Sequence, residues 1–234
     1  MLSQNNFKHA YFTKSSSKKF LQSLGNHFNE NSINCVSNQI HSNLIVLGSY
    51  SEEGTKTNAD GLVGNKCSQN LWIYTADCMP IFFADKRTRN VATLHCGRKG
   101  LEKKIIKNLI KIFDNFGTSR DELLVAIGPA ISKEHYLVDK MTFKEFYRKA
   151  ENKNTTIKLT KTQTDLCFRD SNHFRKQNLN QLDIKRSAYR QLLNENIPYT
   201  NIDISNLCTY KFKNEFNSWR RSQTTSRQWN LICS

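Results

Sequence analysis

Hydrophobic and polar residues fall into separate blocks most clearly between residues 81 and 94. Two short runs, residues 81–84 (IFFA) and 91–94 (VATL), are rich in β-branched and aromatic side chains and flank the polar connector 85–90 (DKRTRN). Two such runs joined by a short polar connector predict a β-hairpin.

The predicted hairpin brings a cysteine and a histidine to the same end. Pairing the two runs outward from the connector sets Ile81 opposite His95, with Cys78 three residues beyond that pair. Pro80 has no N–H to donate to a ladder, so Cys78 is expected in an irregular segment. Such segments carry reactive groups more often than the centres of strands do.

Apolar residues at helical spacing predict helices over residues 101–116, 140–150 and 181–196, and more weakly over 18–28. The dipeptide Asp60–Gly61 predicts a turn. Strand-like segments are expected at residues 9–13, 35–39, 44–47, 71–75, 123–127, 156–159, 202–210 and 228–233.

Strands and helices therefore mix without strict βαβ alternation. We expect an α+β fold: a layered α/β sandwich whose mixed, largely antiparallel sheet carries helices on the outside. The 234 residues suit a single domain over residues 1–234, because no linker interrupts them.

The formal net charge is +15, with 35 lysine and arginine residues against 20 acidic residues. This excess favours an anionic partner: nucleic acid, nucleotide or phosphate. The basic residues are dispersed along the whole chain, however, which is typical of a solvated lysine-rich surface. A nucleic-acid-binding protein concentrates them on one face or interleaves them with stacking aromatic residues, so we do not expect nucleic acid as the partner.

The longest apolar runs are far too short to cross a bilayer, and the N-terminal residues do not have the pattern of a secretory signal. The seven cysteines are odd in number and include no CxxC pair, which argues against a disulfide framework. We expect a cytoplasmic monomer that does not bind a membrane.

Cys78 and His95 at one strand end admit three interpretations. They form a nucleophilic dyad, or bind a metal, or are an ordinary packed cysteine near a hydrogen-bonded histidine. Asp77 favours the first two interpretations over the third, because a carboxylate there can orient a histidine or act as a general base.

The residues after His95 carry a second candidate site. Gly97 and Gly100 bracket Arg98 and Lys99 at the start of the predicted helix. Free backbone N–H groups at a helix N-terminus attract anions, and the two basic side chains add charge. The segment is either a phosphate site or only a tight strand-to-helix turn, and the sequence favours neither.

Several segments together resemble the YfiH-like family, also called the laccase-domain or multicopper polyphenol oxidase family. The resemblance is colinear from about Gln39 to the C-terminus and weak over residues 1–38. The segments that carry it are NADGLV (58–63), TADCMP (75–80), VATLHCGRKG (91–100), AIGPAI (126–131), LCTY (207–210), SWRR (218–221) and QW (228–229).

The resemblance implies a zinc site made by two histidines and one cysteine. The family's Gln-Val-His motif matches residues 39–41, its Ala-Asp-Cys motif residues 76–78, and its His-Ala-Gly-Trp-Arg-Gly motif residues 95–100. The implied ligands are His41, Cys78 and His95. Three protein ligands with an open fourth position are typical of catalytic zinc.

The resemblance also implies an activity, because family members are described as purine nucleoside phosphorylases. They cleave adenosine, inosine and methylthioadenosine with phosphate to the free base and a pentose 1-phosphate, and some also deaminate adenosine. Asp77, Cys78 and His95 are then the expected catalytic residues. The expected substrate-binding residues are Gln39, Arg98, Lys99, Arg220 and Arg221.

The chain departs from the family pattern close to the proposed ligands. Arg98 and Lys99 stand where the family has Trp-Arg. Arg98 thus replaces an aromatic side chain by a guanidinium, and Lys99 replaces a guanidinium, which can donate two parallel hydrogen bonds, by an ammonium, which acts as a point charge. Cys96 replaces a small alanine, and Ala188 stands where an asparagine is usual. We therefore expect a shifted substrate preference or low activity.

Two other functions compete with the phosphorylase. One is a metal-independent hydrolase with Cys78 as nucleophile and His95 as base. The other is a catalytically weak relative that binds nucleic acid or another partner. Copper chemistry is the least expected, because multicopper oxidation needs many histidines and the chain has six, none in a His-x-His pair.

Overall fold

The structure is a computed structural model that describes residues 1–15, 21–28, 31–52, 54–55, 57–150 and 179–234. Its strands are β1 (His9–Tyr11), β2 (Ile33–Val36), β3 (Ile45–Leu47), β4 (Gly61–Val63), β5 (Gln69–Thr75), β6 (Met79–Asp85), β7 (Val91–Cys96), β8 (Leu123–Ile127), β9 (Leu137–Asp139), β10 (Leu179–Gln181), β11 (Ile202–Ile204) and β12 (Gln228–Cys233). Its helices are α1 (Leu21–Phe28), α2 (Arg98–Glu102), α3 (Ile105–Asn115), α4 (Lys140–Ala150), α6 (Ile184–Asn194) and α7 (Trp219–Ser222), with short 3-10 turns η1 (Ser3–Asn5), η3 (Gly48–Tyr50), η4 (Arg120–Glu122), η5 (Lys133–His135) and η6 (Tyr199–Asn201).

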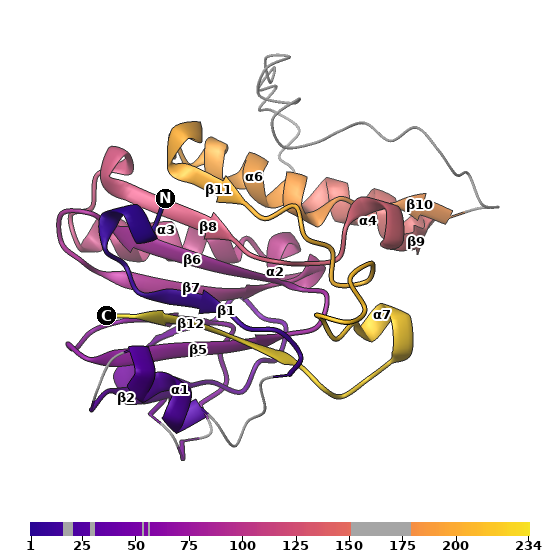
Figure 1. Ribbon diagram of the computed structural model, residues 1–234. Coiled ribbons are helices and arrows are strands. Elements are labelled where there is room, and N and C mark those ends of the chain that lie inside the picture. Colours follow the sequence, from indigo (N-terminus) through magenta and orange to yellow (C-terminus); the bar gives the residue numbers. More distant parts are fainter. Residues whose placement is uncertain (16–20, 29–30, 53, 56, 151–178) are drawn as a thin grey trace.

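Two stacked sheets form the centre of the molecule (Figure 1). One has the strand order β1-β12-β5-β2, and the other has the order β11-β8-β6-β7-β4-β3. Among the described residues, six of nine strand pairings are antiparallel and three are parallel. The expected α+β fold with mixed, largely antiparallel strands is confirmed.

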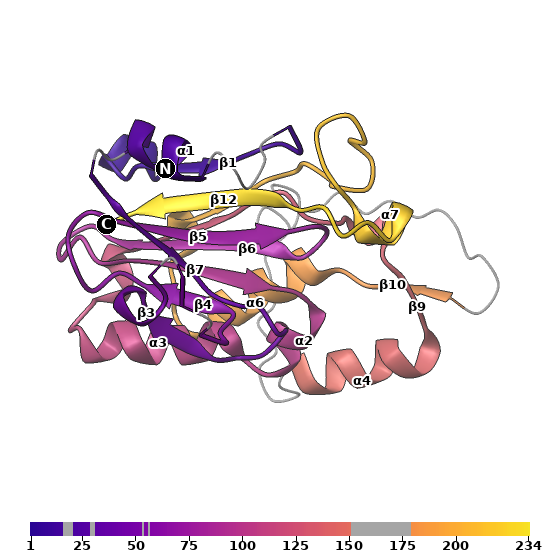
Figure 2. The ribbon, with the colours of Figure 1, turned by 90° about the horizontal axis from the view of Figure 1, so that it is seen from below.

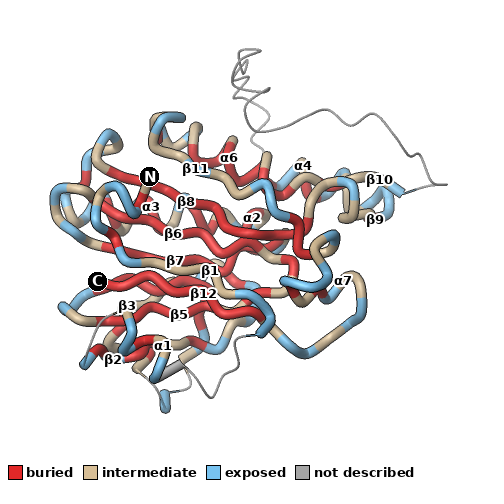
Figure 3. The backbone as a smooth tube through the Cα atoms, in the orientation of Figure 1, coloured by how far each residue is buried: buried red, intermediate tan, exposed pale blue. Residues whose placement is uncertain are grey.

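The layers follow from which side chains each sheet face buries. One cluster fills the space between the sheets, with Phe82 and Leu62 from one sheet and Leu71 and Ile232 from the other. The opposite face of the six-stranded sheet packs on α2, α3, α4 and α6, and α1 lies on the far side of the four-stranded sheet (Figure 2). The central strands are consequently buried on both faces (Figure 3).

The predicted hairpin consists of β6 and β7, but the predicted register was wrong by one residue. His95 pairs with Pro80 rather than with Ile81. The Asp85 carboxylate accepts hydrogen bonds from two backbone amides of the turn, at 2.7 and 3.0 Å. Those bonds keep Asp85 inside β6 and confine the turn to residues 86–90. Cys78 lies directly before β6, in the irregular segment that was predicted.

The helix predicted over residues 101–116 is two helices. Lys104, between α2 and α3, has a left-handed backbone with φ of 60°, which interrupts the helix. The helical residues begin at Arg98, so the turn that follows His95 is shorter than the sequence suggested.

Two further predictions were wrong in part. Gly61 does not form a turn but begins β4, between β3 and β7. A Cβ there would lie 2.7 Å from Leu94 and 2.8 Å from Ile45, so the close approach of neighbouring side chains explains the glycine. The strand predicted over residues 202–210 ends at Ile204, beyond which Cys208 makes only an isolated bridge to Ala130.

The remaining predicted elements are present with small shifts. Residues 9–13, 44–47, 71–75, 123–127 and 228–233 contain strands, and 18–28, 140–150 and 181–196 contain helices. The strand predicted at 35–39 lies earlier, at Ile33–Val36. The predicted strand 156–159 lies outside the described residues. None of the described helices is long and apolar enough to span a membrane.

Candidate metal centre

Three potential ligands from separate segments meet near one end of the hairpin. His41 lies in the loop between β2 and β3, Cys78 directly precedes β6, and His95 lies in β7. Their ligand atoms all lie within 4.8 Å of one another, and Cys78 Sγ is 3.9 Å from His41 Nε2. The three side chains therefore converge, as the family resemblance implied.

The donor set suits a zinc ion. Tetrahedral zinc with one sulfur and two nitrogen ligands needs ligand atoms about 3.3–3.6 Å apart. All the separations here are within 4.8 Å, and the one between Cys78 Sγ and His41 Nε2, 3.9 Å, is close to that range. The donor set and its spacing therefore fit a zinc ion after small side-chain movements.

A buried carboxylate, Asp60, holds two of the three ligands in place. Its Oδ1 accepts a hydrogen bond from His95 Nδ1 at 2.8 Å and one from the His41 amide at 3.0 Å. Its Oδ2 accepts bonds from the amide and hydroxyl of Ser42 at 2.6 and 2.7 Å. Because an ionised carboxylate only accepts, His95 carries its proton on Nδ1 and presents Nε2 to a metal.

The His41 segment is fixed on both sides. His41 has a left-handed φ of 58°, a conformation that the hydrogen bonds to Asp60 stabilise. Lys103 Nζ donates to the His41 carbonyl at 3.0 Å. Gln39, predicted to bind substrate, pairs its amide with the backbone of Tyr74 at 2.7 and 2.9 Å, and so anchors the chain two residues before the ligand.

The charges at the centre favour a thiolate. Burial disfavours charge on Cys78, but the positive charge of His95 and the hydrogen bond with His41 outweigh burial and lower the cysteine pKa to about 6. Burial also opposes charge on His95, whereas Cys78 and Asp60 raise the histidine pKa to about 9. Hydrogen bonds from His95 and Ser42 overcome burial and lower the Asp60 pKa to about 2. Without a metal, Cys78 is thus a thiolate and His95 an imidazolium at neutral pH; a metal bound at Nε2 would displace the proton from that nitrogen and leave the one on Nδ1.

Gly97 gives the thiol its space, which leads to a prediction. A Cβ at this position would lie 2.4 Å from Cys78 Sγ. We expect Gly97→Ala to displace the thiol and lower zinc affinity by about 10-fold or more, a loss like that from disturbing groups around a ligand. Zinc content after dialysis measures the effect. Gly100→Ala is the matched control, because its Cβ would lie 3.4 Å from its nearest neighbour, Ile105, an ordinary contact distance, and it should keep its zinc.

Asp77, the predicted catalytic carboxylate, adjoins Cys78 with a φ of 95°. Its side chain accepts hydrogen bonds from Thr209 Oγ1 at 2.7 Å, Ser218 Oγ at 3.0 Å and the Arg220 amide at 2.7 Å. These bonds tie α7 and the loop before it to the metal ligands. Asp77 therefore has a positioning role, and the proton transfer expected of it stays a prediction.

The neighbouring arginines of α7 have different environments. Arg221 donates to the backbone carbonyls of Thr209, Tyr210 and Phe216 at 2.7–2.8 Å, which commits its guanidinium to holding the loop. Arg220 donates to the Leu137 carbonyl at 2.6 Å. The backbone amide of Arg220 is bound to Asp77, next to Cys78, whereas the guanidinium of Arg221 is bound to the carbonyls of its own loop.

Arg98 and Lys99 open α2, directly after Gly97. Arg98 Nη1 pairs with Glu102 at 2.5 Å, and its side chain also interacts with Tyr136. Lys99 is exposed. Since α2 has only five residues, its N-terminus is too short to argue for an anion site by itself, and the phosphate interpretation of this turn stays a prediction.

The sequence analysis missed the roles of several residues. Asp60 was interpreted only as part of a turn, although it lies in NADGLV, one of the segments that carry the family resemblance. Thr209 and Ser218 likewise lie in LCTY and SWRR. The only sequence signal for these roles was that the three polar residues lie inside segments that carry the family resemblance. The residues around Thr209 and Ser218 do not indicate that either side chain contacts Asp77.

Comparison with known proteins matches most of the chain. The family model described as multi-copper polyphenol oxidoreductase laccase matches residues 14–234. A purine nucleoside phosphorylase of Synechocystis sp. is 25% identical over 239 residues, covering 97% of this chain and 89% of that protein. One of Borreliella burgdorferi is 28% identical, covering 82% and 77%. One of Bacteroides thetaiotaomicron is 27% identical, but the alignment spans 69% of this chain and only 55% of that protein.

Solved structures share the fold. A protein of Neisseria meningitidis superposes with a TM-score of 0.72 at 24% identity, covering 92% of this chain and 78% of that one. YlmD of Geobacillus stearothermophilus gives a TM-score of 0.72 at 24% identity, covering 86% and 73%. At this level of identity the likeness supports the layered α+β architecture alone.

Proposed function

The chain belongs to the multi-copper polyphenol oxidoreductase laccase family, and from that premise we propose that it is a zinc-dependent purine nucleoside phosphorylase. The proposed substrates are adenosine, inosine and methylthioadenosine together with inorganic phosphate, with adenosine deamination as a side activity. The observation that carries the proposal is the convergence of His41, Cys78 and His95 in a chain similar to curated purine nucleoside phosphorylases.

The proposed reaction exchanges one bond at the sugar. A phosphate oxygen forms a bond to C1′ of the pentose while the bond from C1′ to the purine nitrogen breaks. The electron pair leaves with the base, which takes up a proton. A bound zinc would supply a Lewis acid that withdraws electron density from a substrate oxygen.

Two carboxylates of the protein position the groups that would take part in this reaction. Asp60 fixes the protonated nitrogen of His95 and the backbone of His41, so the centre is assembled before substrate arrives. Asp77 holds the amide of Arg220, and the Arg220 guanidinium lies over the Tyr136 ring, where we propose that it binds phosphate. Guanidinium groups suit phosphate because they donate two parallel hydrogen bonds.

A single assay tests the proposal. Purified zinc-loaded protein is incubated with each of the three nucleosides, with and without phosphate, and the released bases are separated by chromatography. Phosphate-dependent release of base is the expected result, and inosine formed from adenosine would report the side activity. No release of base from any nucleoside in the presence of phosphate would contradict the proposal.

A Cys–His hydrolase is the second candidate, and one observation favours it. The thiolate–imidazolium pair of Cys78 and His95 is the arrangement that activates cysteine nucleophiles. A strong metal chelator separates the two functions. Turnover that survives the chelator and is lost on thiol alkylation would favour the hydrolase.

The same pair predicts the pH dependence of thiol alkylation. In chelator-treated protein, the alkylation rate of Cys78 should rise with pH through about 6, the pKa of the thiol, instead of about 8.5 for an ordinary cysteine. Above that pH the thiolate fraction is saturated, so the rate should then level off. Iodoacetamide labelling followed by mass spectrometry measures the rate residue by residue. The exposed Cys67 is the internal reference, and an equal midpoint for both cysteines would contradict the prediction.

A further inference from the structure

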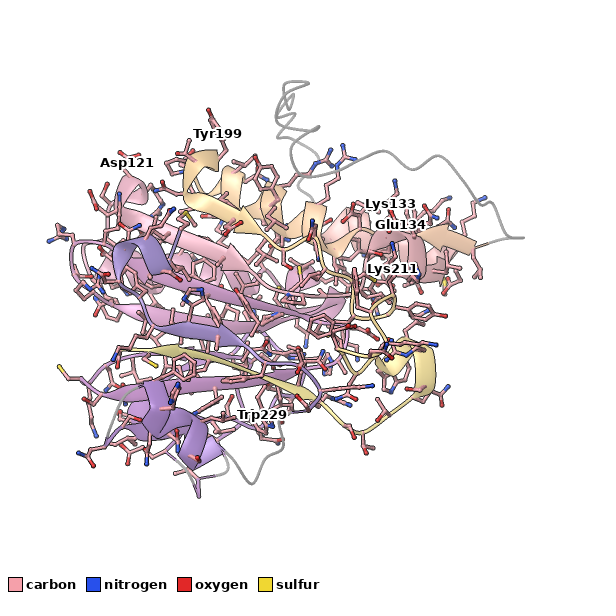
Figure 4. The ribbon with its side chains drawn as sticks, viewed as in Figure 1. Asp121, Lys133, Glu134, Tyr199, Lys211 and Trp229 are labelled. Carbon is pink, nitrogen blue, oxygen red and sulfur yellow. The ribbon has the colours of Figure 1, made fainter. Side chains whose placement is uncertain are left out.

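Tyr136 lies between two arginines beside the metal centre. It follows η5 and precedes β9, and its side chain is half-buried. The Arg220 guanidinium lies over its ring, 5.0 Å from the centroid. The side chains of Lys133, Glu134 and Lys211 lie close to one another (Figure 4), and the rings of His135 and Tyr210 are 4.5 Å apart.

Tyr136 contacts two residues that adjoin the segments of the proposed ligands: Arg98, which follows Gly97, and Arg220, whose amide donates to Asp77. The Tyr136 hydroxyl interacts with the Arg98 side chain and lies within the electrostatic influence of both Cys78 and Arg220. A tyrosine hydroxyl is protonated at neutral pH and donates one hydrogen bond. The Tyr136 side chain and the two guanidinium groups therefore lie together, and Arg98 and Arg220 each adjoin a residue that contacts or precedes Cys78.

Both guanidinium groups are held in place, and their bonds to the described residues leave some of their donors unused. Arg98 uses Nη1 for Glu102 at 2.5 Å, and Arg220 uses Nη1 for the Leu137 carbonyl at 2.6 Å. A guanidinium has five N–H donors in a fixed fork. The bonds to Glu102 and Leu137 orient the two guanidinium groups but occupy only one nitrogen of each, whereas Arg221 donates to three carbonyls.

We propose that Tyr136, Arg98 and Arg220 form a subsite for a tetrahedral oxyanion, inorganic phosphate, next to the metal centre. The inference rests on the proposed function and adds to it the place where phosphate binds and a donor, Tyr136, that the sequence did not indicate. Two guanidinium groups and one hydroxyl can donate hydrogen bonds to several oxygens of one phosphate. Phosphate bound there lies beside Cys78 and hence beside the reacting centre.

The subsite is particular to this chain in one respect. Arg98 stands where the family pattern has tryptophan, so this chain has a second guanidinium facing Tyr136. That charge strengthens the attraction for an anion in a half-buried site, where electrostatic interactions are weakly screened. The departure at residue 98 thus has a consequence for phosphate affinity.

The test measures phosphate binding and zinc content in the same proteins. Zinc-loaded wild type, Tyr136→Phe and Arg98→Gln are titrated with inorganic phosphate by calorimetry, without nucleoside. Removing one hydrogen bond to a charged ligand should weaken phosphate binding about 10- to 100-fold in each variant, with zinc content unchanged. In turnover assays the KM for phosphate should rise while the KM for nucleoside stays constant.

Matched controls remove a tyrosine hydroxyl and a positive charge elsewhere. Tyr199→Phe alters an exposed tyrosine on η6, on a different part of the molecule (Figure 4), and Lys107→Gln removes one exposed positive charge on α3. Both should leave phosphate binding unchanged. Thermal unfolding of every variant checks that the fold is retained.

The outcomes separate the subsite from the proposed function. Wild-type phosphorolysis with phosphate binding that neither Tyr136→Phe nor Arg98→Gln weakens would overturn the subsite and leave the function. Loss of zinc from these variants together with loss of phosphate binding would also overturn it, because the residues would then act through the metal. Tyr136-dependent phosphate binding without cleavage of any nucleoside would support the subsite and contradict the phosphorylase.

Discussion

Replacing Cys78 by alanine is expected to abolish stoichiometric zinc binding and to reduce nucleoside phosphorolysis by about 1,000-fold or more. Thiolate is the strongest zinc donor of the three ligands, and its loss leaves two histidines of which one is exposed. A Lewis acid in an active site contributes several kcal/mol to transition-state stabilisation, which corresponds to this change in rate. Metal analysis of purified protein and a turnover assay measure the two effects.

Cys67→Ala is the matched control, because it removes the thiol of an exposed cysteine outside the centre. It should retain one zinc per chain and full activity. A Cys78→Ala protein that keeps stoichiometric zinc would show that the ligand set is wrong. Wild-type protein that binds no zinc when zinc is supplied would show the same.

The three ligands differ in how far the sequence alone could place them. Cys78 and His95 were found together because both flank one hairpin, and local pattern predicts hairpins well. His41 was found only through the family resemblance, because its position depends on bonds to Asp60 and on a left-handed backbone. Long-range hydrogen bonds of this kind leave no periodic signal in a single sequence.

The errors in the fold have the same origin. The hairpin register is set by carboxylate–amide bonds of Asp85, and the division of α2 from α3 by the left-handed backbone at Lys104. The layered architecture, by contrast, follows from which strands are apolar throughout, and that property is visible in the sequence. The pattern of apolar residues therefore predicted the layers, while individual residues such as Asp85 and Lys104 determined the strand register and the helix ends.

Arg220 and Arg221 show why residue type does not settle a role. Both were expected to bind substrate, and they are adjacent in sequence on α7. Arg221 is engaged by three carbonyls of its own loop, whereas Arg220 packs over Tyr136 and donates to Leu137. Consecutive helical residues point about 100° apart, which directs one side chain to the carbonyls of the loop and the other to Tyr136.

The Asp60 carboxylate is expected to control both the stability and the metal affinity of the protein. It is fully buried and accepts bonds from His95, His41 and Ser42. Its folded-state pKa of about 2 lies below the unfolded value of about 3.9. Stabilisation from this group, about 2–3 kcal/mol before allowance for its coupling to His95, is thus present above pH 4 and lost as pH falls from 4 to 2.

Asp60→Asn tests both roles in one protein. The amide keeps the shape of the carboxylate but cannot act as an acceptor at both ends, so the tautomer of His95 is no longer fixed and zinc affinity should fall about 10- to 100-fold. Denaturant unfolding should show a lower stability at pH 7 than wild type, and the difference should shrink as pH falls from 4 to 2. Asp121→Asn, at an exposed aspartate away from the centre (Figure 4), should behave as wild type. The substitution leaves one bond between these residues intact, because the His95 backbone amide also donates to the Asp60 backbone carbonyl at 2.8 Å. Unchanged zinc affinity in Asp60→Asn would therefore mean that the backbone bonds of β7 orient His95 and that the Asp60 carboxylate is not needed.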